Sequence, residues 1–230
     1  MTGAGGRIGA VVRERLGARW NIRATDLKPA DGIEELDVAD FERCVAMFRG
    51  ADAVVHLAAD PNPDADWEAL KGPNVDGGYA VAAAARECGV RRLVLASSVH
   101  AVSAYPDTVQ RRAEDAPRPA NLYGATKAWA EALGAWVAAS SRTSVVALRI
   151  GYFSERSPTG KDASPRNLSA WLSHGDCARL IQASVESEHD GFLVVNGISA
   201  NRYRIVELGE AERRIGYTPG DDAWAPLTRD

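Results

Sequence analysis

The sequence begins Met1-Thr2-Gly3-Ala4-Gly5-Gly6-Arg7-Ile8-Gly9, and its glycines at positions 3, 6 and 9 follow the spacing G-x-x-G-x-x-G. This spacing is typical of the turn that joins a strand to a helix in dinucleotide-binding folds. The glycines permit a tight turn and a close approach of the backbone to a pyrophosphate, which lies on the helix N-terminus. Glycine-rich turns are common, so the pattern indicates such a site only if the following segments fit the fold.

Strand-like and helix-like patterns alternate from this turn to residue 151. Residues 6–16 have the apolar spacing of a helix, and the β-branched run 53–57 is typical of a buried strand. By the same patterns we expect strands at 20–26, 33–38, 53–57, 92–96 and 144–150, and helices at 6–16, 41–48, 67–88 and 124–140. The alternation predicts an α/β fold, a Rossmann-type doubly wound parallel sheet with helices on both faces.

The pattern changes after Gly151. Residues 154–166 are rich in Ser, Pro, Gly and charge and predict a loop, and a helix at 175–185, a strand at 192–196 and a helix at 205–215 follow. This tail is too short for an independent domain. We therefore expect residues 1–151 to form the cofactor-binding domain with the catalytic residues, and residues 152–230 to form a small C-terminal substrate cap on one edge of the sheet.

The glycine-rich turn lies unusually close to the start of the sequence. Only Met1 and Thr2 precede it, whereas a dinucleotide fold places its first strand there, in the centre of the sheet. Without that strand, its neighbours would keep unpaired backbone groups, each costing about 1–3 kcal/mol if buried. We therefore expect a truncated first strand and a sequence that starts inside a longer chain.

The composition excludes several classes of protein. The 230 residues carry a net charge of -4, with both signs interspersed, so neither nucleic acid nor an anionic membrane surface is an expected partner. No apolar run is long enough for a membrane span. Cys44, Cys88 and Cys177 are scattered and odd in number, which predicts free thiols in a reducing, cytoplasmic compartment. No cluster has metal-ligand spacing, so no metal is expected.

Asp26 strengthens the prediction of a dinucleotide site. It lies 17 residues after Gly9, at the end of the second expected strand, where a carboxylate can bind the adenosine ribose hydroxyls. The alternative is a turn or cap aspartate. Together the two features predict NAD binding, and the charge of Asp26 would repel the 2′-phosphate of NADP. Arg7 and Lys28 argue the other way, since either could reach a phosphate.

Tyr123 and Lys127 form a Y-x-x-x-K pair at the start of an expected helix, on one helix face. The Lys127 ammonium and a positive nicotinamide ring would together lower the pKa of Tyr123, so that the phenol can remove a hydroxyl proton as hydride leaves. Ser98 closes a strand 25 residues earlier and can hydrogen-bond the reacting oxygen. The alternatives are a surface helix pair and a strand-end cap.

Taken together, these motifs make the sequence resemble the extended short-chain dehydrogenase/reductase superfamily, also called the NAD-dependent epimerase/dehydratase family. The resemblance covers nearly the whole chain. Its marks are Thr2-Gly3-x-x-Gly6-x-x-Gly9, Asp26, Asp37-Val38, His56-Leu57-Ala58-Ala59, Asn74-Val75, Ser97-Ser98, Tyr123-x-x-x-Lys127 and Arg149-Ile150-Gly151.

The resemblance implies NAD as the cofactor and a role for each matching residue. Asp37 and Val38 would flank the adenine, Leu57 to Ala59 would run under the pyrophosphate and ribose, and Ile150 would lie near the carboxamide. The full implied cofactor-binding set is Gly3, Gly6, Arg7, Ile8, Gly9, Asp26, Leu27, Asp37, Val38, Leu57, Ala58, Ala59, Asn74, Tyr123, Lys127 and Ile150. Ser98, Tyr123 and Lys127 would be catalytic.

Within this family the sequence is most similar to uronate dehydrogenases and archaeal NAD-dependent glucose-6-phosphate dehydrogenases. Segments 96–100, 118–124, 149–151 and 166–173 carry the similarity. It implies a substrate-binding set of Pro61, Ser98, Val99, His100, Tyr123, Tyr152 and Arg166. Val99 stands where the family usually has Asn, and Pro61 and Tyr152 stand where uronate dehydrogenases have serines, so the sugar stays open.

The expected reaction is oxidation of C1 of a monosaccharide, a hexuronate, an aldose or a hexose phosphate, to a lactone. One alternative is a sugar epimerase or dehydratase that keeps its NAD and returns the hydride. A non-catalytic NAD-sensing protein is another, but such proteins often lose the Tyr or the Lys, and this chain has both. The resemblance also implies a homodimer through the two long helices expected at 67–88 and 124–140.

Overall fold

The computed structural model of the chain describes residues 1–225, and its centre is a parallel β-sheet. Strands β3 (Ala53–His56), β4 (Arg92–Ser98), β5 (Ser144–Ile150) and β8 (Phe192–Gly197) pair in the order β3-β4-β5-β8. Strand β1 (Thr25–Asp26) pairs with β2 (Glu34–Glu35). Thr2 bridges Thr25 on one side and His56 on the other, and so joins the two parts.

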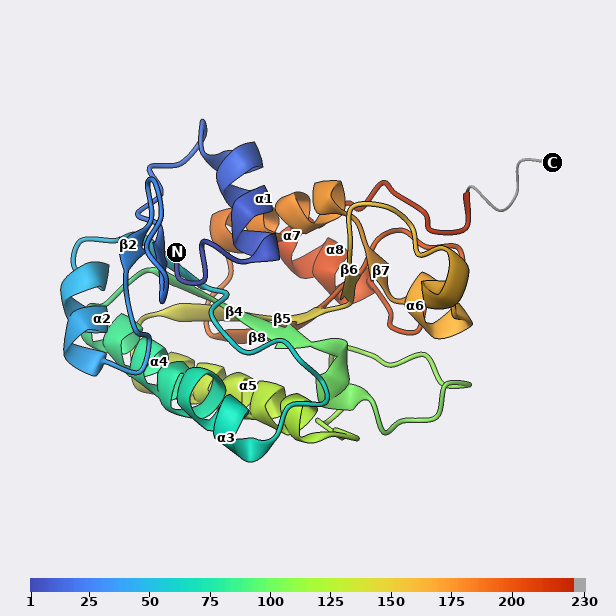
Figure 1. Cartoon of the computed structure of the whole chain (residues 1–230), viewed down its shortest axis with the longest axis horizontal. Coiled ribbons are helices and arrows are strands. Elements are labelled where there is room, and N and C mark those ends of the chain that lie inside the picture. Colours follow the sequence, from blue (N-terminus) through green and yellow to red (C-terminus); the bar gives the residue numbers. More distant parts are fainter. Residues whose placement is uncertain (226–230) are drawn as a thin grey trace.

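Helices cover both faces of the sheet (Figure 1). One face carries α1 (Arg7–Leu16), α7 (His174–Glu186) and α8 (Gly209–Ile215), and the other carries α2 (Phe41–Phe48), α4 (Gly77–Glu87) and α5 (Leu122–Ser140). Every residue of β5 is buried, because its side chains alternate between the two cores: Val146 and Leu148 face one, and Val145 and Ala147 face the other. The predicted α/β fold with a parallel sheet is confirmed.

Some predicted elements needed correction. The strands expected at 20–26 and 33–38 are shorter than predicted, and they pair with each other over only two residues. On its other side β1 has a single bridge, to Thr2, and β2 lies at the sheet edge, so neither has a long neighbouring strand. The helix expected at 67–88 is divided into α3 (Trp67–Leu70), the π-helix η1 (Lys71–Asp76) and α4. Pro73 lies inside η1, where its missing N–H disturbs the regular hydrogen bonding.

Corrections also apply near the C-terminus. The helix expected from residue 205 begins only at Gly209. The loop expected at 154–166 contains a 3₁₀ turn, η3 (Gly160–Asp162), and the start of α6 (Pro165–Ser169). Ser164 caps α6 by accepting a hydrogen bond from the Asn167 N–H, and Pro165 occupies the first turn, where its missing N–H does no harm.

The segment after residue 151 packs closely on the rest of the chain. Its strand β8 extends the main sheet beside β5, and its helix α7 contacts α1. The parallel pair β6 (Tyr152–Phe153) and β7 (Trp171–Leu172) forms a separate small sheet, and α6 lies between its strands in the chain. The division into residues 1–151 and 152–230 stays a prediction. Within residues 1–225, no helix is both long and apolar enough to cross a membrane.

Candidate active site

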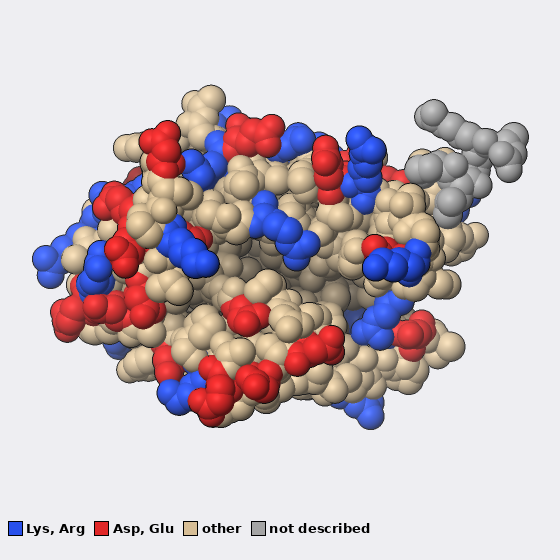
Figure 2. All heavy atoms as spheres, viewed as in Figure 1, with Lys and Arg blue, Asp and Glu red and all other residues tan. Residues whose placement is uncertain are grey.

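A cavity of about 400 Å³ opens where β3, β4 and β5 end at their carboxyl edge. This edge is where open parallel sheets bind ligands. The glycine-rich turn and the start of α1 form one wall, and the start of α5 and the segment around α6 form the others. Figure 2 shows this face hollowed near its centre, with acidic and basic side chains interspersed around the hollow.

Most of the predicted site residues meet at this cavity. It is lined by Gly3, Gly6, Arg7, Ile8, Gly9, Leu57, Ala59, Pro61, Ser98, Val99, His100, Tyr123, Lys127, Ile150, Tyr152 and Arg166. The predicted residues outside its lining are Asp26, Leu27, Asp37, Val38, Ala58 and Asn74. Sequence reasoning missed Pro63, Ala96, Ser97, Gly151, Phe153, Asn167, Ala170 and Ile205, which also line it. Most of these are small or apolar residues whose types carry no chemical signal.

The glycine-rich turn packs directly against the chain that follows β3. Gly3 has φ of +68°, and a Cβ there would lie 2.5 Å from the Ala58 nitrogen. A Cβ on Gly9 would lie 2.4 Å from the Gly3 oxygen, so glycine is required for helix α1 to start this close to the turn. Gly6 caps α1 without any side-chain hydrogen bond. The helix N-terminus therefore presents backbone N–H groups to the cavity, which suits a pyrophosphate.

Asp26 lies at the rim beside this turn. Its Oδ2 accepts a hydrogen bond from the Gly5 N–H at 2.9 Å, and its Oδ1 accepts one from the Lys28 N–H at 3.4 Å. The carboxylate is thus fixed at the end of β1, next to the helix N-terminus. Leu27 is exposed beside it. This position fits a ribose bound alongside a pyrophosphate on α1.

Asp37, Val38, Ala58 and Asn74 are also absent from the cavity lining. The Asp37 carboxylate accepts a hydrogen bond from the Ala39 N–H, and Val38 is a core residue. Asn74 exchanges hydrogen bonds with the Asp60 backbone at 2.7 and 3.1 Å. It also donates to the Thr126 hydroxyl at 3.1 Å, and so ties the loop after β3 to α5. Direct cofactor contacts of these residues stay predictions.

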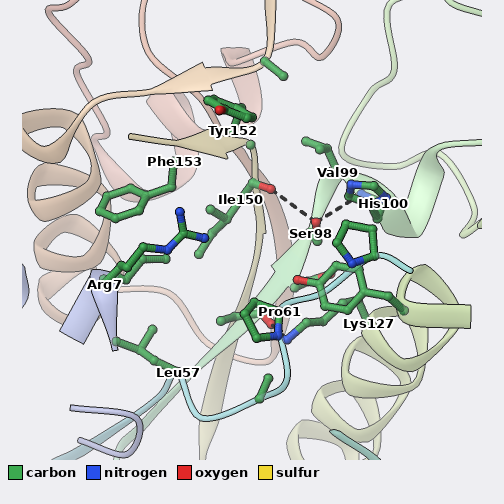
Figure 3. A pocket seen from close by; sticks show the side chains of 18 of the residues that line it. Arg7, Leu57, Pro61, Ser98, Val99, His100, Lys127, Ile150, Tyr152 and Phe153 are labelled. Atoms are coloured by element: carbon green, nitrogen blue, oxygen red, sulfur yellow. Dashed lines mark hydrogen bonds between the residues drawn. The ribbon is translucent and has the colours of Figure 1, made fainter. Parts of the chain in front are cut away.

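Ser98 and Lys127 face the cavity (Figure 3), and Tyr123 lines the same cavity. The Ser98 hydroxyl lies within hydrogen-bonding reach of the Tyr123 phenol, and it also accepts from the His100 N–H at 3.2 Å. The Lys127 ammonium lies 5.4 Å from the centre of the Tyr123 ring. Helix α5 begins close to this point, where the Asn121 side chain caps it through the Gly124 N–H.

Burial dominates the electrostatics of this set. Desolvation raises the pKa of the Tyr123 phenol, and the hydrogen bond with Ser98 and the charge of Arg7 only partly oppose it. Burial lowers the pKa of Lys127 to about 8, and its ammonium donates to the Ala96 carbonyl at 3.0 Å. The protein alone therefore does not lower the Tyr123 pKa, and the lowering expected with a bound cofactor stays a prediction. That expectation also includes the positive nicotinamide ring of a bound cofactor, whose charge would lower the Tyr123 pKa.

The expected substrate-binding residues His100, Pro61, Tyr152 and Arg166 line the same cavity. The His100 ring meets the Tyr123 ring edge to face with centres 5.5 Å apart, and burial, assisted by the charge of Arg166, lowers the His100 pKa. Arg7 points into the cavity from the opposite wall (Figure 3). Cationic side chains thus face the cavity from two sides. Among the described residues, no group of three or more His, Cys, Asp or Glu side chains could hold a metal ion.

A buried network that sequence reasoning missed lies behind the catalytic set. The Ser97 hydroxyl donates to Glu131 Oε1 at 2.6 Å, and Arg149 donates to both oxygens of the Glu131 carboxylate at 2.9 Å. Glu131 follows Lys127 by four residues on the same helix face, which is the one signal in the sequence that could have found it. The network joins the ends of β4 and β5 to α5.

Comparison with known proteins agrees with this geometry. The profile of the family described as "NAD dependent epimerase/dehydratase family" matches residues 1–175. L-arabinose 1-dehydrogenase (NAD(P)(+)) of Haloferax volcanii is 36% identical over 97% of this chain and 96% of that protein. NAD-dependent glucose-6-phosphate dehydrogenase of the same organism is 34% identical over 97% of this chain and 93% of that protein.

A solved structure extends the match to three dimensions. A mutant of uronate dehydrogenase from Agrobacterium tumefaciens, complexed with NAD, superposes with a TM-score of 0.88 at 33% identity, over 97% of this chain and 84% of that chain. The chain therefore belongs to the NAD-dependent epimerase/dehydratase family. The predicted family and the predicted NAD cofactor are both confirmed.

Proposed function

We propose that the protein is an NAD-dependent dehydrogenase that oxidises the C1 hydroxyl of a monosaccharide to a lactone. The observation that carries the proposal is the buried meeting of Ser98, Tyr123 and Lys127 at the end of a cavity whose opposite wall is the glycine-rich turn. The predicted class of activity, an NAD-dependent sugar dehydrogenase, is confirmed by the full-length similarity to sugar dehydrogenases.

The cofactor supplies the acceptor for the hydride that leaves C1. The start of α1 would hold its pyrophosphate, and Asp26 would hold the adenosine ribose and disfavour a 2′-phosphate. Tyr123, as the phenolate, takes the proton of the C1 hydroxyl, and Ser98 donates a hydrogen bond to the same oxygen. The Lys127 ammonium lies beside the phenol and stabilises its negative charge. Loss of one proton and one hydride leaves the C1 carbonyl of the lactone.

The proposed substrate class follows from Arg166 in the cavity lining. Arg166 is the residue best placed to bind a carboxylate or phosphate at the far end of the sugar, because a guanidinium can pair with either in two hydrogen bonds. We therefore favour a hexuronate or a hexose phosphate over a neutral aldose. Tyr152 and Arg166 both lie after residue 151, so the C-terminal segment acts as the substrate-binding cap.

The proposal also includes the oligomeric state of the protein. Outer-facing aromatic side chains on α4 and α5 include Tyr79 and Trp136, whose rings stack with centres 6.3 Å apart, and Trp129. Exposed aromatic groups on two neighbouring helices favour a protein interface. We infer a homodimer through α4 and α5. The cytoplasm is the proposed compartment, which fits the three free cysteines Cys44, Cys88 and Cys177.

A screen for NADH formation tests the proposed activity. Purified protein with NAD is offered D-glucuronate, D-galacturonate, D-glucose 6-phosphate, D-glucose, L-arabinose and, in a parallel assay for interconversion, UDP-glucose, and absorbance at the NADH band is followed. We expect turnover with at least one of these sugars and a lactone as the product. Interconversion of a nucleotide sugar without NADH release would contradict the proposal and support the epimerase alternative.

A further inference from the structure

Asp107 lies between two arginines that have different surroundings. Its Oδ1 accepts a hydrogen bond from Arg111 at 2.7 Å, and the same oxygen lies 3.9 Å from Arg166. Arg111 is buried, whereas Arg166 is partly exposed and lines the cavity. Asp107 itself is absent from the cavity lining, so it can act on a bound sugar only through Arg166.

Arg111 is held in place and therefore fixes Asp107. Its guanidinium also donates to the Tyr105 carbonyl at 2.8 Å, and its backbone exchanges hydrogen bonds with Ile205 and Glu207 at 3.0 and 2.9 Å. The hydrogen bond from Arg111, assisted by the charge of Arg166, holds the pKa of the Asp107 carboxyl below its usual range. The carboxylate is thus a fixed negative charge at the substrate end of the cavity.

The contact between Asp107 and Arg166 is loose. At 3.9 Å it is too long for a hydrogen bond, so the donors of Arg166 stay available to another anion. The Asp107 charge nevertheless neutralises part of the attraction that Arg166 offers. A carboxylate or phosphate on the sugar and Asp107 would therefore compete for one guanidinium, whereas a neutral sugar would not.

We propose that Asp107 sets the preference of the enzyme between anionic and neutral sugars by acting as a competing counter-charge for Arg166. This inference rests on the proposed function, because it assumes that Arg166 binds the anionic group of the substrate. It makes Asp107 a positioning residue that lowers the affinity for anionic sugars and leaves neutral ones unaffected.

The variant Asp107→Asn tests this inference, because the amide oxygen can still accept the hydrogen bond from Arg111. The pairs D-glucuronate/D-glucose and D-galacturonate/D-galactose differ only at C6, so kcat and KM are measured for each. We expect kcat/KM for the uronates to rise about three- to tenfold through a lower KM, with less than about a twofold change for the neutral sugars. The gain should shrink at high salt, since both side chains are partly exposed.

Glu114→Gln is the matched control, because it removes one exposed negative charge from the same loop. Glu114 pairs with Arg112 and lies outside the cavity lining, so its variant should leave the uronate-to-neutral ratio unchanged. In an Arg166→Ala background, Asp107→Asn should change that ratio by no more than about twofold. An unchanged ratio in Asp107→Asn, a selective loss of uronate activity, or an equal loss for both sugar classes would overturn the inference.

A binding experiment distinguishes a failure of this inference about Asp107 from a failure of the proposed dehydrogenase activity. Calorimetric titration of D-glucuronate and D-glucose 6-phosphate into the NADH complexes of the native protein and Asp107→Asn reads binding without turnover. A native protein that binds these anions but does not oxidise them would contradict the dehydrogenase proposal alone. Tighter anion binding by Asp107→Asn would still support the role of Asp107, and equal binding would overturn it.

Discussion

Tyr123 is the residue on which the proposed chemistry depends most. Removing its hydroxyl removes the proton acceptor and leaves the cavity shape nearly unchanged, so Tyr123→Phe should lower kcat by about 10²–10⁴-fold. NAD binding, followed by quenching of tryptophan fluorescence, should stay near that of the native protein. Tyr203→Phe, at an exposed position, is the matched control. Turnover close to native in Tyr123→Phe would remove the phenol from the mechanism.

Lys127 is a buried ammonium whose pKa falls from the usual 10.5 to about 8. Because the folded pKa lies below the unfolded one, the ammonium costs stability below pH 8, and the cost disappears as the pH rises from 8 to 10.5. It amounts to about 3 kcal/mol, offset by about 1 kcal/mol from the hydrogen bond to Ala96.

The variant Lys127→Met should therefore be more stable than the native protein by about 2 kcal/mol at pH 7, and this difference should be mostly lost by pH 10.5. Turnover should be lost at both pH values. Urea unfolding of the two proteins without cofactor measures the difference, because the titration of other groups cancels between them. A variant less stable than the native protein at pH 7 would show that the ammonium is favourably held.

The sequence could point to those residues of the candidate site that belong to a recognisable local motif. Tyr123 and Lys127 share a helix face by spacing alone, and the structure brings both to the cavity. Asp107 and Ile205 were not predictable, because each depends on how segments far apart in the chain meet. Arg111 donates to Asp107, four residues away, and to the Ile205 carbonyl, 94 residues away, and no local pattern encodes the second contact.

At the scale of elements, the buried pair of Glu131 and Arg149 holds α5 against the ends of β4 and β5. Glu131→Ala leaves the Arg149 charge buried with only backbone carbonyl partners, so it should cost about 3–5 kcal/mol in the free energy of unfolding. The double variant Glu131→Leu with Arg149→Met should recover much of that loss, because no charge remains buried. Denaturant unfolding measures both. A double variant as unstable as the single one would mean that packing, not charge, determines the cost.

Elements with a strong periodic pattern were predicted closely, and those that depend on partners were not. The helix at 41–48 and the strand at 144–150 have the predicted bounds, since each has a clear apolar pattern and a buried face. The strands expected at 20–26 and 33–38 pair over only two residues each. Strand length is set by the neighbouring strand, which a single segment does not reveal.

For the whole molecule, the proposed dimer gives a direct test. A charge at the centre of the aromatic surface on α4 and α5 would be buried in the interface, so Trp136→Glu should convert a dimer into a monomer. Tyr203→Glu, at an exposed residue elsewhere, should leave the dimer intact. Sedimentation velocity distinguishes the two states. A native protein that sediments as a monomer would contradict the proposed assembly.

The central claim is that hydride leaves C1 of a sugar and passes to NAD, and isotopic labelling tests it most directly. The protein is given NAD and the best sugar from the screen, once with deuterium at C1 and once with deuterium at C2. We predict that the C1 label alone appears in the reduced cofactor, seen by mass spectrometry, while NMR shows the lactone. C1 deuterium that stays on the sugar, or reduced cofactor labelled from C2, would contradict the account.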